Sequence, residues 1–354
     1  MELTSQHIKV ADSLEAVNRL FYGRGWTDGL PIVPPTEEAV AKMVEYLGRE
    51  PQEVVVSVPP RWGEATVEKI AINAVMAGCL PEYLPVIIAA MEAMAEAPFN
   101  LYGVQATTHP CAPLVIVNGP AAQELEINWG YGAFGPAWRA NATIGRAVRL
   151  VLMNVGGAVP GTLDKATQGH PGKFSFCIAE NEVESPWEPL HVERGFPREA
   201  STVTVTACEG PHNINDHAAI SAVGVLKTVA GTMAEPGSNN MAYTAGEPLL
   251  CLGPEHAETV ARDGFTKVKV KEYLYQNARL PVSVLSPERV RERQQDKETY
   301  AQFDAKGFLP VCRRQEDIMV MVVGGAGKHS AFLPSFGLSR SVTKEIRFPA
   351  QKAG

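Results

Sequence analysis

Short apolar runs that stop at polar, glycine-rich turns set the strongest limit on how this chain can fold. Residues 114–117 and 318–323 are continuous apolar runs with the length of buried strands. Patterns with helical spacing lie between such runs, and strands that alternate with helices indicate an α/β fold. In α/β proteins, the loops that leave the carboxyl ends of strands build the ligand site. We therefore expect an α/β protein whose ligand site lies among these turns, as is typical of an enzyme.

The length of the chain favours two domains. Its 354 residues are 45% apolar, so it can bury a sizeable core. The stretch 184–198 contains several Pro and Glu residues and a Trp, and it marks a domain boundary. We expect an N-terminal α/β domain over 1–198 and a C-terminal α/β domain with glycine-rich loops over 199–354. Each is predicted to contain a mostly parallel or mixed sheet flanked by helices.

Charge and composition limit the kinds of molecule that this protein is expected to bind. A formal net charge of −7 without a basic stripe argues against nucleic acid and against an anionic membrane surface. The longest apolar stretches are too short to span a bilayer, and residues 1–6 lack the features of a signal peptide. The six cysteines show no tight spacing, which favours reduced thiols. We expect a cytoplasmic protein with a small-molecule substrate and neither a nucleic-acid nor a membrane partner, and homo-oligomerisation stays open.

Several unusual phrases in the first half of the chain point to a known family. The stretch Gly25-Trp26-Thr27-Asp28-Gly29-Leu30-Pro31 resembles the opening of the bacterial UGSC-type (seleno)protein family. The resemblance covers nearly all of residues 20–200, and it implies a soluble bacterial enzyme without an assigned reaction. This chain lacks the Cys(or selenocysteine)-Gly-Ser-Cys tetrapeptide of the family, so a selenol or dithiol redox role is not carried over. The further matching phrases are 63–69, 77–83, 139–146 and 184–187.

The segment 208–217 is the densest group of candidate metal ligands. Cys208, His212 and His217 supply a soft thiolate and two imidazoles between a predicted strand and a predicted helix. Such a set can hold zinc, iron or nickel with an open coordination position, so one transition metal is a candidate cofactor. Two alternatives stay open. The segment is a turn with helix-capping residues, or His212 is a general base without a metal.

A second candidate lies just before the strand at 114–117. His109 and Cys111 are two residues apart, and an imidazole near a thiol can lower the thiol pKa and create a nucleophile. The alternative is a rigid strand entry between Pro110 and Pro113, with Cys111 as a small buried side chain.

Two arginines on one helical face form a candidate anion site. Arg139 and Arg146 are seven residues apart, with Arg139 in the first turn, where free N–H groups favour an anion. They could clamp a carboxylate or phosphate. The alternative is a salt bridge to Glu180, Glu182 or Glu184. Side-chain amides are further candidates for substrate binding. Asn141 lies in the same helical turn as Arg139, and the others are Asn118, Asn239 and Asn240.

The turn at 324–330 combines glycines with Lys328 and His329, which we take as candidate catalytic residues facing a substrate. Because it has neither the P-loop spacing nor the dinucleotide fingerprint, no nucleotide cofactor is expected. Glu180 and Glu182 alternate after a predicted strand and could share one face. Neighbouring like charges raise each other's pKa, as acid–base chemistry requires, and a solvated strand end is the alternative.

These observations favour a soluble enzyme that acts on a small, anionic metabolite or xenobiotic. The predicted chemistry is metal-assisted or acid–base-assisted hydrolysis or elimination, in a cleft between the two domains, with hydrolase or lyase favoured over oxidoreductase. The catalytic candidates are His212, His217, Lys328 and His329, with His109 and Cys111 as a second set. The competing hypotheses are a thiol-dependent oxidoreductase that uses Cys111 and His109, and a non-catalytic protein that binds a small molecule.

Overall fold

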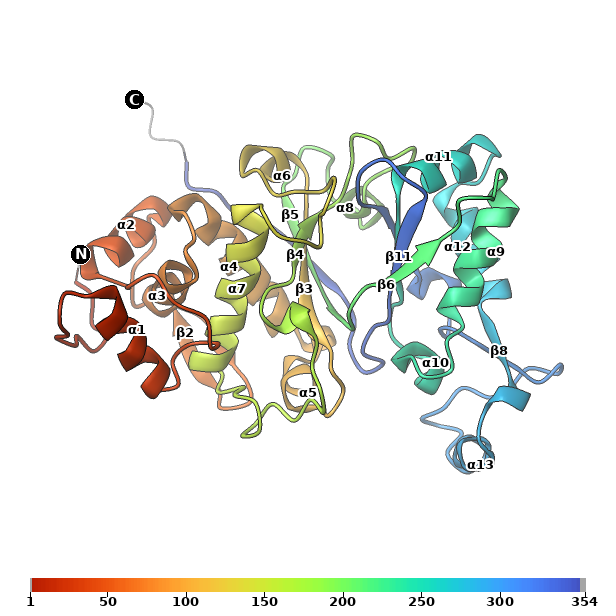
Figure 1. Ribbon diagram of the computed structural model, residues 1–354, viewed down its shortest axis with the longest axis horizontal. Helices are drawn as coiled ribbons and strands as arrows, with labels where there is room; N and C mark the ends of the chain where they lie inside the picture. The colour runs from red at the N-terminus through yellow and green to blue at the C-terminus, as the bar shows by residue number, and fades with distance from the viewer. Residues whose placement is uncertain (1, 351–354) are drawn as a thin grey trace.

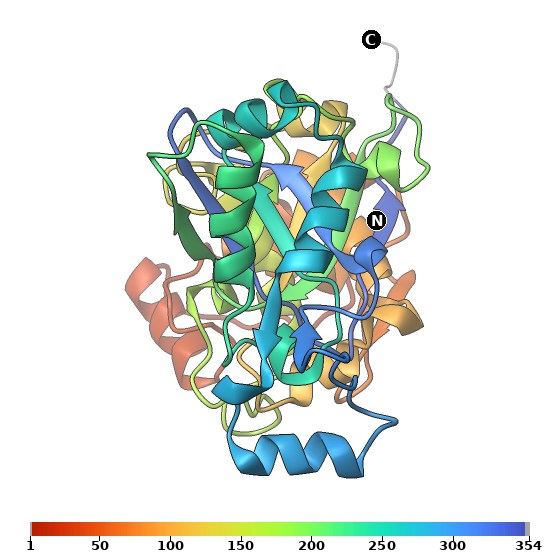
Figure 2. The same cartoon turned by 90° about the vertical axis from the view of Figure 1, so that its right-hand side faces the viewer.

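The computed structural model describes residues 2–350 and arranges them in four layers. Two sheets face each other in the middle, and each carries helices on its outer side (Figure 1). The chain begins in the helical layer on the left of Figure 1, and the helices of the opposite layer come from residues beyond 221. Figure 2 looks onto this second helical layer, with the strands behind it.

The first sheet has the order β12-β5-β3-β4. Its strands β3 and β4 are parallel, whereas β5 is antiparallel to both β3 and β12. Alternation along β5 puts Val203 and Val205 toward the helices and Thr204 and Thr206 on the opposite face. The bounds are β3 Ala112–Asn118, β4 Cys177–Ala179, β5 Thr202–Cys208 and β12 Val342–Glu345.

Helices α4 and α7 cover the outer face of the first sheet, and α3 packs against α7 on the side away from the sheet. Helix α4 is apolar around almost its whole circumference, because it is packed on both sides. Thr36 and Thr66 accept hydrogen bonds from backbone N–H groups and so begin α2 and α3. The elements of this layer are α1 Leu14–Gly23, α2 Glu37–Leu47, α3 Val67–Ala77, α4 Leu84–Ala95 and α7 Arg139–Asn154, with the hairpin β1 Val54–Val58 and β2 Gly63–Thr66.

The second sheet has the order β10-β7-β11-β6, in which only β10 and β7 are parallel. Leu250, Val320 and Phe332 point from it into the core shared with the outer helices. The strands are β6 His212–Asn215, β7 Leu249–Leu252, β10 Met319–Val322 and β11 His329–Leu333. The helices are α9 Ala222–Met233, α11 Pro254–Arg262 and α12 Lys267–Asn277.

The space between the two sheets is a packed apolar core. Leu114 and Ile116 of the first sheet meet Leu249, Met321 and Leu333 of the second in one buried cluster. Side chains at i and i+2 share a face of a strand, so each sheet contributes one set of residues to this cluster and the other set to its own helices.

The α/β fold class predicted from the sequence is confirmed, and the sheets are mixed, with mainly antiparallel pairs. The first sheet crosses the expected boundary at 198, because β5 and β12 both come from the later part of the chain. The smaller helices and strands are α5 Leu101–Ala106, α6 Pro120–Glu124, α8 Leu190–Glu193, α10 Asn239–Tyr243, α13 Pro287–Gln295, β8 Arg279–Pro281 and β9 Phe308–Pro310.

Within residues 2–350, no single helix combines the length and the apolar composition that a membrane crossing requires. The segments 81–95 and 97–106 meet that test only as a pair, bent by 76°.

Candidate functional site

The polar turns gather at the two opposite ends of β3. We call the end that contains His109, His170 and Glu209 the histidine end, and the end that contains Asn118, Glu180 and Glu182 the carboxylate end. The antiparallel register pairs Ala112 with Cys208 at the first end and Asn118 with Thr202 at the other. Seven residues of extended strand separate the two ends by roughly 20 Å.

At the histidine end, a carboxylate holds an imidazole ring. His109 lies just before β3 and Glu209 just after β5, and the antiparallel pairing brings them together. The His109 Nε2 atom is 2.8 Å from Glu209 Oε1, which also accepts the backbone N–H of Asn239 at 3.0 Å. The His109 ring is stacked on Phe336, with a centroid distance of 5.5 Å and an angle of 23° between the planes. Glu209 therefore holds the edge of the ring, and Phe336 holds its face.

The hydrogen bonding leaves one nitrogen of His109 without a partner. Because a carboxylate oxygen accepts hydrogen bonds, Nε2 is the donor in this contact, and in the neutral ring the lone pair lies on Nδ1. This Nδ1 atom is buried and has no hydrogen-bond partner within residues 2–350. A buried polar atom without a partner calls for an explanation, and a nitrogen left available to a water molecule or a substrate is one. An imidazole oriented by a carboxylate, with its other nitrogen basic, has the arrangement of a general base.

His170 supports this end without offering a free nitrogen. Its Nε2 donates to the carbonyl oxygen of Cys208 at 3.2 Å, and its Nδ1 accepts the N–H of Gly172 at 3.1 Å. Burial lowers the pKa of His170, so the ring is neutral near neutral pH. We assign His170 to the positioning of the loop that carries Glu209.

The asparagines expected to bind substrate instead hold the segment that contains Phe336. Asn239 Oδ1 accepts the N–H of Gly337 at 2.8 Å. Asn240 is fully buried and accepts the N–H of Ser335 at 2.7 Å, while its amide donates to the carbonyl of Ala245 at 2.8 Å. Both side chains therefore hold the backbone on either side of Phe336, the residue on which the His109 ring stacks.

The thiol of Cys111 is not activated in this structure. Cys111 is 1% exposed, and burial raises its pKa to about 12. A thiol with such a pKa stays protonated near neutral pH and is a poor nucleophile. His109 directs Nε2 to Glu209 instead. This is a correction to the expected pairing of His109 with Cys111.

The three expected metal ligands are not brought together. Cys208 is buried between the two sheets, and burial raises its pKa to about 12. His212 is exposed and lies 3.3 Å from Glu235, whereas His217 lies 3.2 Å from His329. Within the part of the chain that the structure describes, no group of three or more His, Cys, Asp or Glu side chains is arranged to hold a metal.

At the carboxylate end, the acidic side chains bind mainly backbone and amide donors. The amide of Asn118 donates to Glu180 Oε2 at 2.7 Å and to Glu182 Oε1 at 3.0 Å. Glu180 also accepts the N–H of Leu190, and Glu182 accepts that of Gly119. Burial raises the pKa of Glu180, although Lys267 at 3.9 Å opposes this rise. These contacts join the ends of β3 and β4 to the start of α8.

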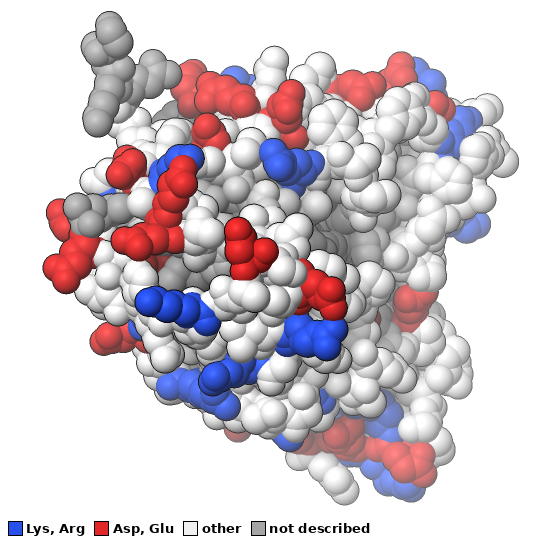
Figure 3. Space-filling model, turned by 60° about the vertical axis from the view of Figure 1, so that its left-hand side comes forward, with Lys and Arg blue, Asp and Glu red and all other residues white. Residues whose placement is uncertain are grey.

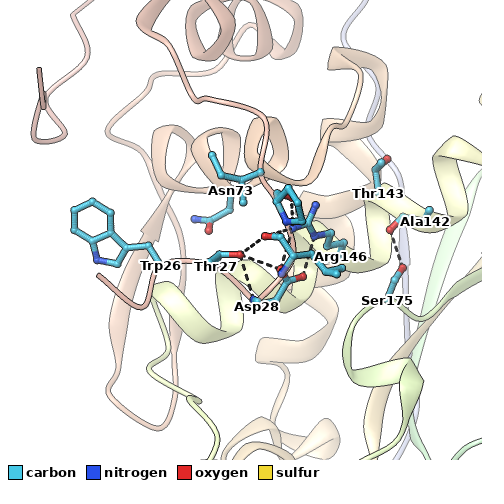
Figure 4. A network of polar contacts seen from close by, with 12 residues as sticks. Trp26, Thr27, Asp28, Asn73, Ala142, Thr143, Arg146 and Ser175 are labelled. Atoms are coloured by element: carbon cyan, nitrogen blue, oxygen red, sulfur yellow. Dashed lines mark hydrogen bonds and ion pairs between the residues drawn. The ribbon is translucent and has the colours of Figure 1, made fainter. Parts of the chain in front are cut away.

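Arg146 has a partner that sequence reasoning did not anticipate. Its Nε and Nη2 atoms donate to the two oxygens of Asp28 at 2.8 and 2.9 Å, and Nη2 also donates to the carbonyl of Pro31 at 2.8 Å (Figure 4). Burial alone would raise the pKa of Asp28, but the guanidinium, together with the N–H of Leu30 and the hydroxyl of Thr27, lowers that pKa below its ordinary value. Arg146 therefore holds the turn at residues 25–31 and is not free to bind an anion.

The other two candidates on α7 do not complete an anion site. Arg139 is exposed at the start of the helix. Asn141 is buried, where it accepts the N–H of Asn128 at 2.8 Å and donates to the carbonyl of the same residue at 3.0 Å. Its amide is used within the protein.

The glycine-rich turn after β10 approaches the loop that precedes α7. The N–H of Gly324 donates to the carbonyl of Trp129 at 2.8 Å. A Cβ atom at Gly325 would lie 2.3 Å from the Tyr131 ring, so a side chain at this position would clash. Lys328 donates to the carbonyl of His217 at 3.2 Å. The turn is thus packed against its neighbours, and His329 is its exposed histidine.

A separate cavity of about 330 Å³ lies against α2 and α4, beside the C-terminal segment. Its lining includes Leu47, Ile88, Phe348 and the charged residues Arg49, Glu92 and Arg347, without a histidine, cysteine or serine. His109, whose Nε2 atom is hydrogen-bonded directly to Glu209, lies at the histidine end, and we place the candidate site there.

Sequence reasoning missed Glu209 and Phe336. Glu209 stood in the segment 208–217, directly after a strand, and this position was the available signal. A comparison with protein-family models finds no match for this chain, and a comparison with curated proteins finds no significant relative. The resemblance to the UGSC-type family therefore stays a prediction.

Proposed function

We propose that this protein is an acid–base enzyme of the hydrolase or lyase class, with His109 as the general base and Glu209 as its orienting carboxylate. One observation carries the proposal. The 2.8 Å contact between His109 Nε2 and Glu209 Oε1 leaves a basic Nδ1 atom that is buried without a partner in the described residues. General base catalysis by such a group contributes typically about 10²–10⁴-fold to a rate.

In this proposal, His109 Nδ1 takes a proton from the substrate or from a water molecule. Glu209 then stabilises the positive charge of the imidazolium through its hydrogen bond to Nε2. The same ring returns the proton to the leaving group in a later step. Since Nδ1 is buried, the loops around it must open for a substrate to reach it. Hydrolysis and elimination both need this proton transfer.

The proposed substrate is a small molecule. Arg146 was the main reason to expect an anionic substrate, and it is paired with Asp28 instead. We also propose a cytoplasmic location. All six cysteines are free and buried, as expected in a reducing compartment. Figure 3 shows acidic and basic side chains on one face of the molecule. The expectation of no nucleic-acid partner continues to depend on the net charge of −7.

The test compares three purified variants in two assays. The probes are a panel of small nitrophenyl esters for hydrolysis and a panel of 2- and 3-hydroxy acids for the loss of water. We expect His109→Gln and Glu209→Gln to lose about 10²–10⁴-fold in rate on any probe that the unaltered protein turns over. His212→Gln is the matched control, because His212 also lies near a carboxylate, at 3.3 Å from Glu235, but is exposed.

Unchanged rates in both His109→Gln and Glu209→Gln would overturn the proposal. Saturable binding of a probe without turnover would favour the non-catalytic binding protein instead. Circular dichroism of each variant separates a loss of chemistry from a loss of fold.

A further inference from the structure

Two histidines that are 112 residues apart in the sequence meet at one end of the antiparallel pair β6 and β11. His217 follows β6 and His329 begins β11, with Asn215 opposite His329 in the register. Their Nε2 atoms are 3.2 Å apart, and both side chains are exposed. The two rings meet edge to face, with an angle of 77° between their planes.

The distance between the two nitrogens matches the spacing of two ligands on one metal ion. Metal–nitrogen bonds of about 2.0–2.1 Å place two imidazole nitrogens about 3.4 Å apart in tetrahedral geometry and about 2.9 Å apart at a right angle. The 3.2 Å spacing lies within this interval. In the absence of metal, the N–H of one ring donates a hydrogen bond to the other ring across the same gap.

A neighbouring amide orients His329 as a metal ligand. Its Nδ1 atom lies 2.9 Å from Asn213 Oδ1. Since this oxygen only accepts, Nδ1 carries the proton and the lone pair of His329 lies on Nε2, facing His217. Histidines that bind metals typically have such a partner on the other nitrogen, which fixes the tautomer and the ring orientation.

The backbone around His217 is also held in place. Asp216 accepts the N–H groups of Ala218 and Ala219 at 3.2 and 2.8 Å and the hydroxyl of Thr228 at 2.6 Å. Lys328 donates to the carbonyl of His217, and this contact connects the two strands. The pair is therefore arranged before a ligand arrives, which reduces the entropy lost on binding.

We propose that His217 and His329 form a two-histidine site for a divalent transition-metal ion, with water in the remaining positions. Imidazole nitrogen suits zinc, nickel and copper, and copper(II) should bind more tightly than nickel(II). This site uses neither Cys208 nor His212, and it is independent of the acid–base chemistry at His109.

The experiment measures the binding of Ni²⁺ to the full chain by isothermal titration calorimetry, after removal of metals with a chelator. We expect one equivalent of Ni²⁺. Its affinity should fall at least tenfold in His217→Ala and in His329→Ala. Asn213→Ala keeps both ligands but loses the orienting oxygen, and its affinity should fall roughly 10–100-fold.

His212→Ala is the matched control, since His212 is an exposed histidine on the same strand β6. It should bind Ni²⁺ like the unaltered chain. The proposal is overturned by an absence of stoichiometric binding. It is equally overturned if His217→Ala retains the full affinity, or if His212→Ala loses as much affinity as His217→Ala does.

Discussion

The two ends of β3 each have a carboxylate at the junction of the sheets, but the partners of these carboxylates differ. Glu180 is buried and binds an asparagine amide and the backbone of Leu190. Glu209 remains partly accessible and shares a hydrogen bond with the titratable ring of His109. Lys267 lies 3.9 Å from Glu180 and His191 lies 3.8 Å from Glu182, which is too far for a hydrogen bond in either case. Glu209 is bonded directly to an imidazole, which can support proton transfer. The partner therefore decides the role of each carboxylate.

The largest expected effect tests this division directly. Glu209→Gln should lower the rate on an active probe by about 10²–10⁴-fold, because the neutral amide cannot stabilise an imidazolium. Glu182→Gln at the carboxylate end should keep most of the rate, since Glu182 binds Asn118 and Gly119. Steady-state rates of both variants decide the comparison. A large loss of rate in Glu182→Gln, with the fold intact, would move the chemistry to the carboxylate end.

The next effect concerns stability away from both ends. Arg146→Ala leaves the mostly buried Asp28 without its bidentate partner and should lower the free energy of unfolding by about 3 kcal/mol. The double variant Arg146→Ala with Asp28→Asn should recover part of this loss, because no buried charge remains. Urea denaturation provides the measurement. If Arg146→Ala has the stability of the unaltered protein, the prediction is wrong and Arg146 is again a candidate for ligand binding.

A smaller effect is the pH dependence that Glu180, at the carboxylate end, gives to the free energy of unfolding. Burial raises the pKa of Glu180 above its ordinary value of 4.5, so the native protein holds this proton more tightly than the unfolded chain. The stability that this group contributes is present below pH 4.5 and is lost as the pH rises through the native pKa. The free energy of unfolding should therefore fall with rising pH in the unaltered protein relative to Glu180→Gln.

Urea denaturation of both proteins from about pH 4 to pH 8 measures this difference, and the other titrating groups largely cancel in the comparison. A difference that grows in favour of the unaltered protein as the pH rises would show that Glu180 is stabilised as a carboxylate.

The smallest expected effect is at Cys111. With its pKa raised to about 12, only about one thiol in 10⁴ is ionised at pH 8. Iodoacetamide should modify native Cys111 far more slowly than it does in denaturant, and Cys111→Ser should keep the activity of the unaltered protein. Peptide mass spectrometry follows the modification. Fast alkylation of native Cys111, together with inactivity of Cys111→Ser, would restore the thiol-enzyme hypothesis.

Local patterns were sufficient to predict several elements of the fold, but not β6, β11 or β12. The alternation of Val and Thr at 202–206 predicts a strand, and the structure contains β5 there, with Val toward the helices. The strand at 114–117 and the α/β class follow from the same kind of pattern and are confirmed. These features depend on side chains within a few residues of each other, so the sequence alone determines them.

The tertiary structure alone decided the long-range pairs. His109 meets Glu209 across 100 residues, Arg146 meets Asp28 across 118, and His217 meets His329 across 112. Each pair depends on the register between strands or on the packing of a helix against a distant turn. The spacing of residues along one chain carries no information about either. For the same reason, β12 could not be assigned to the sheet of β3, since that pairing is set by which apolar faces pack together.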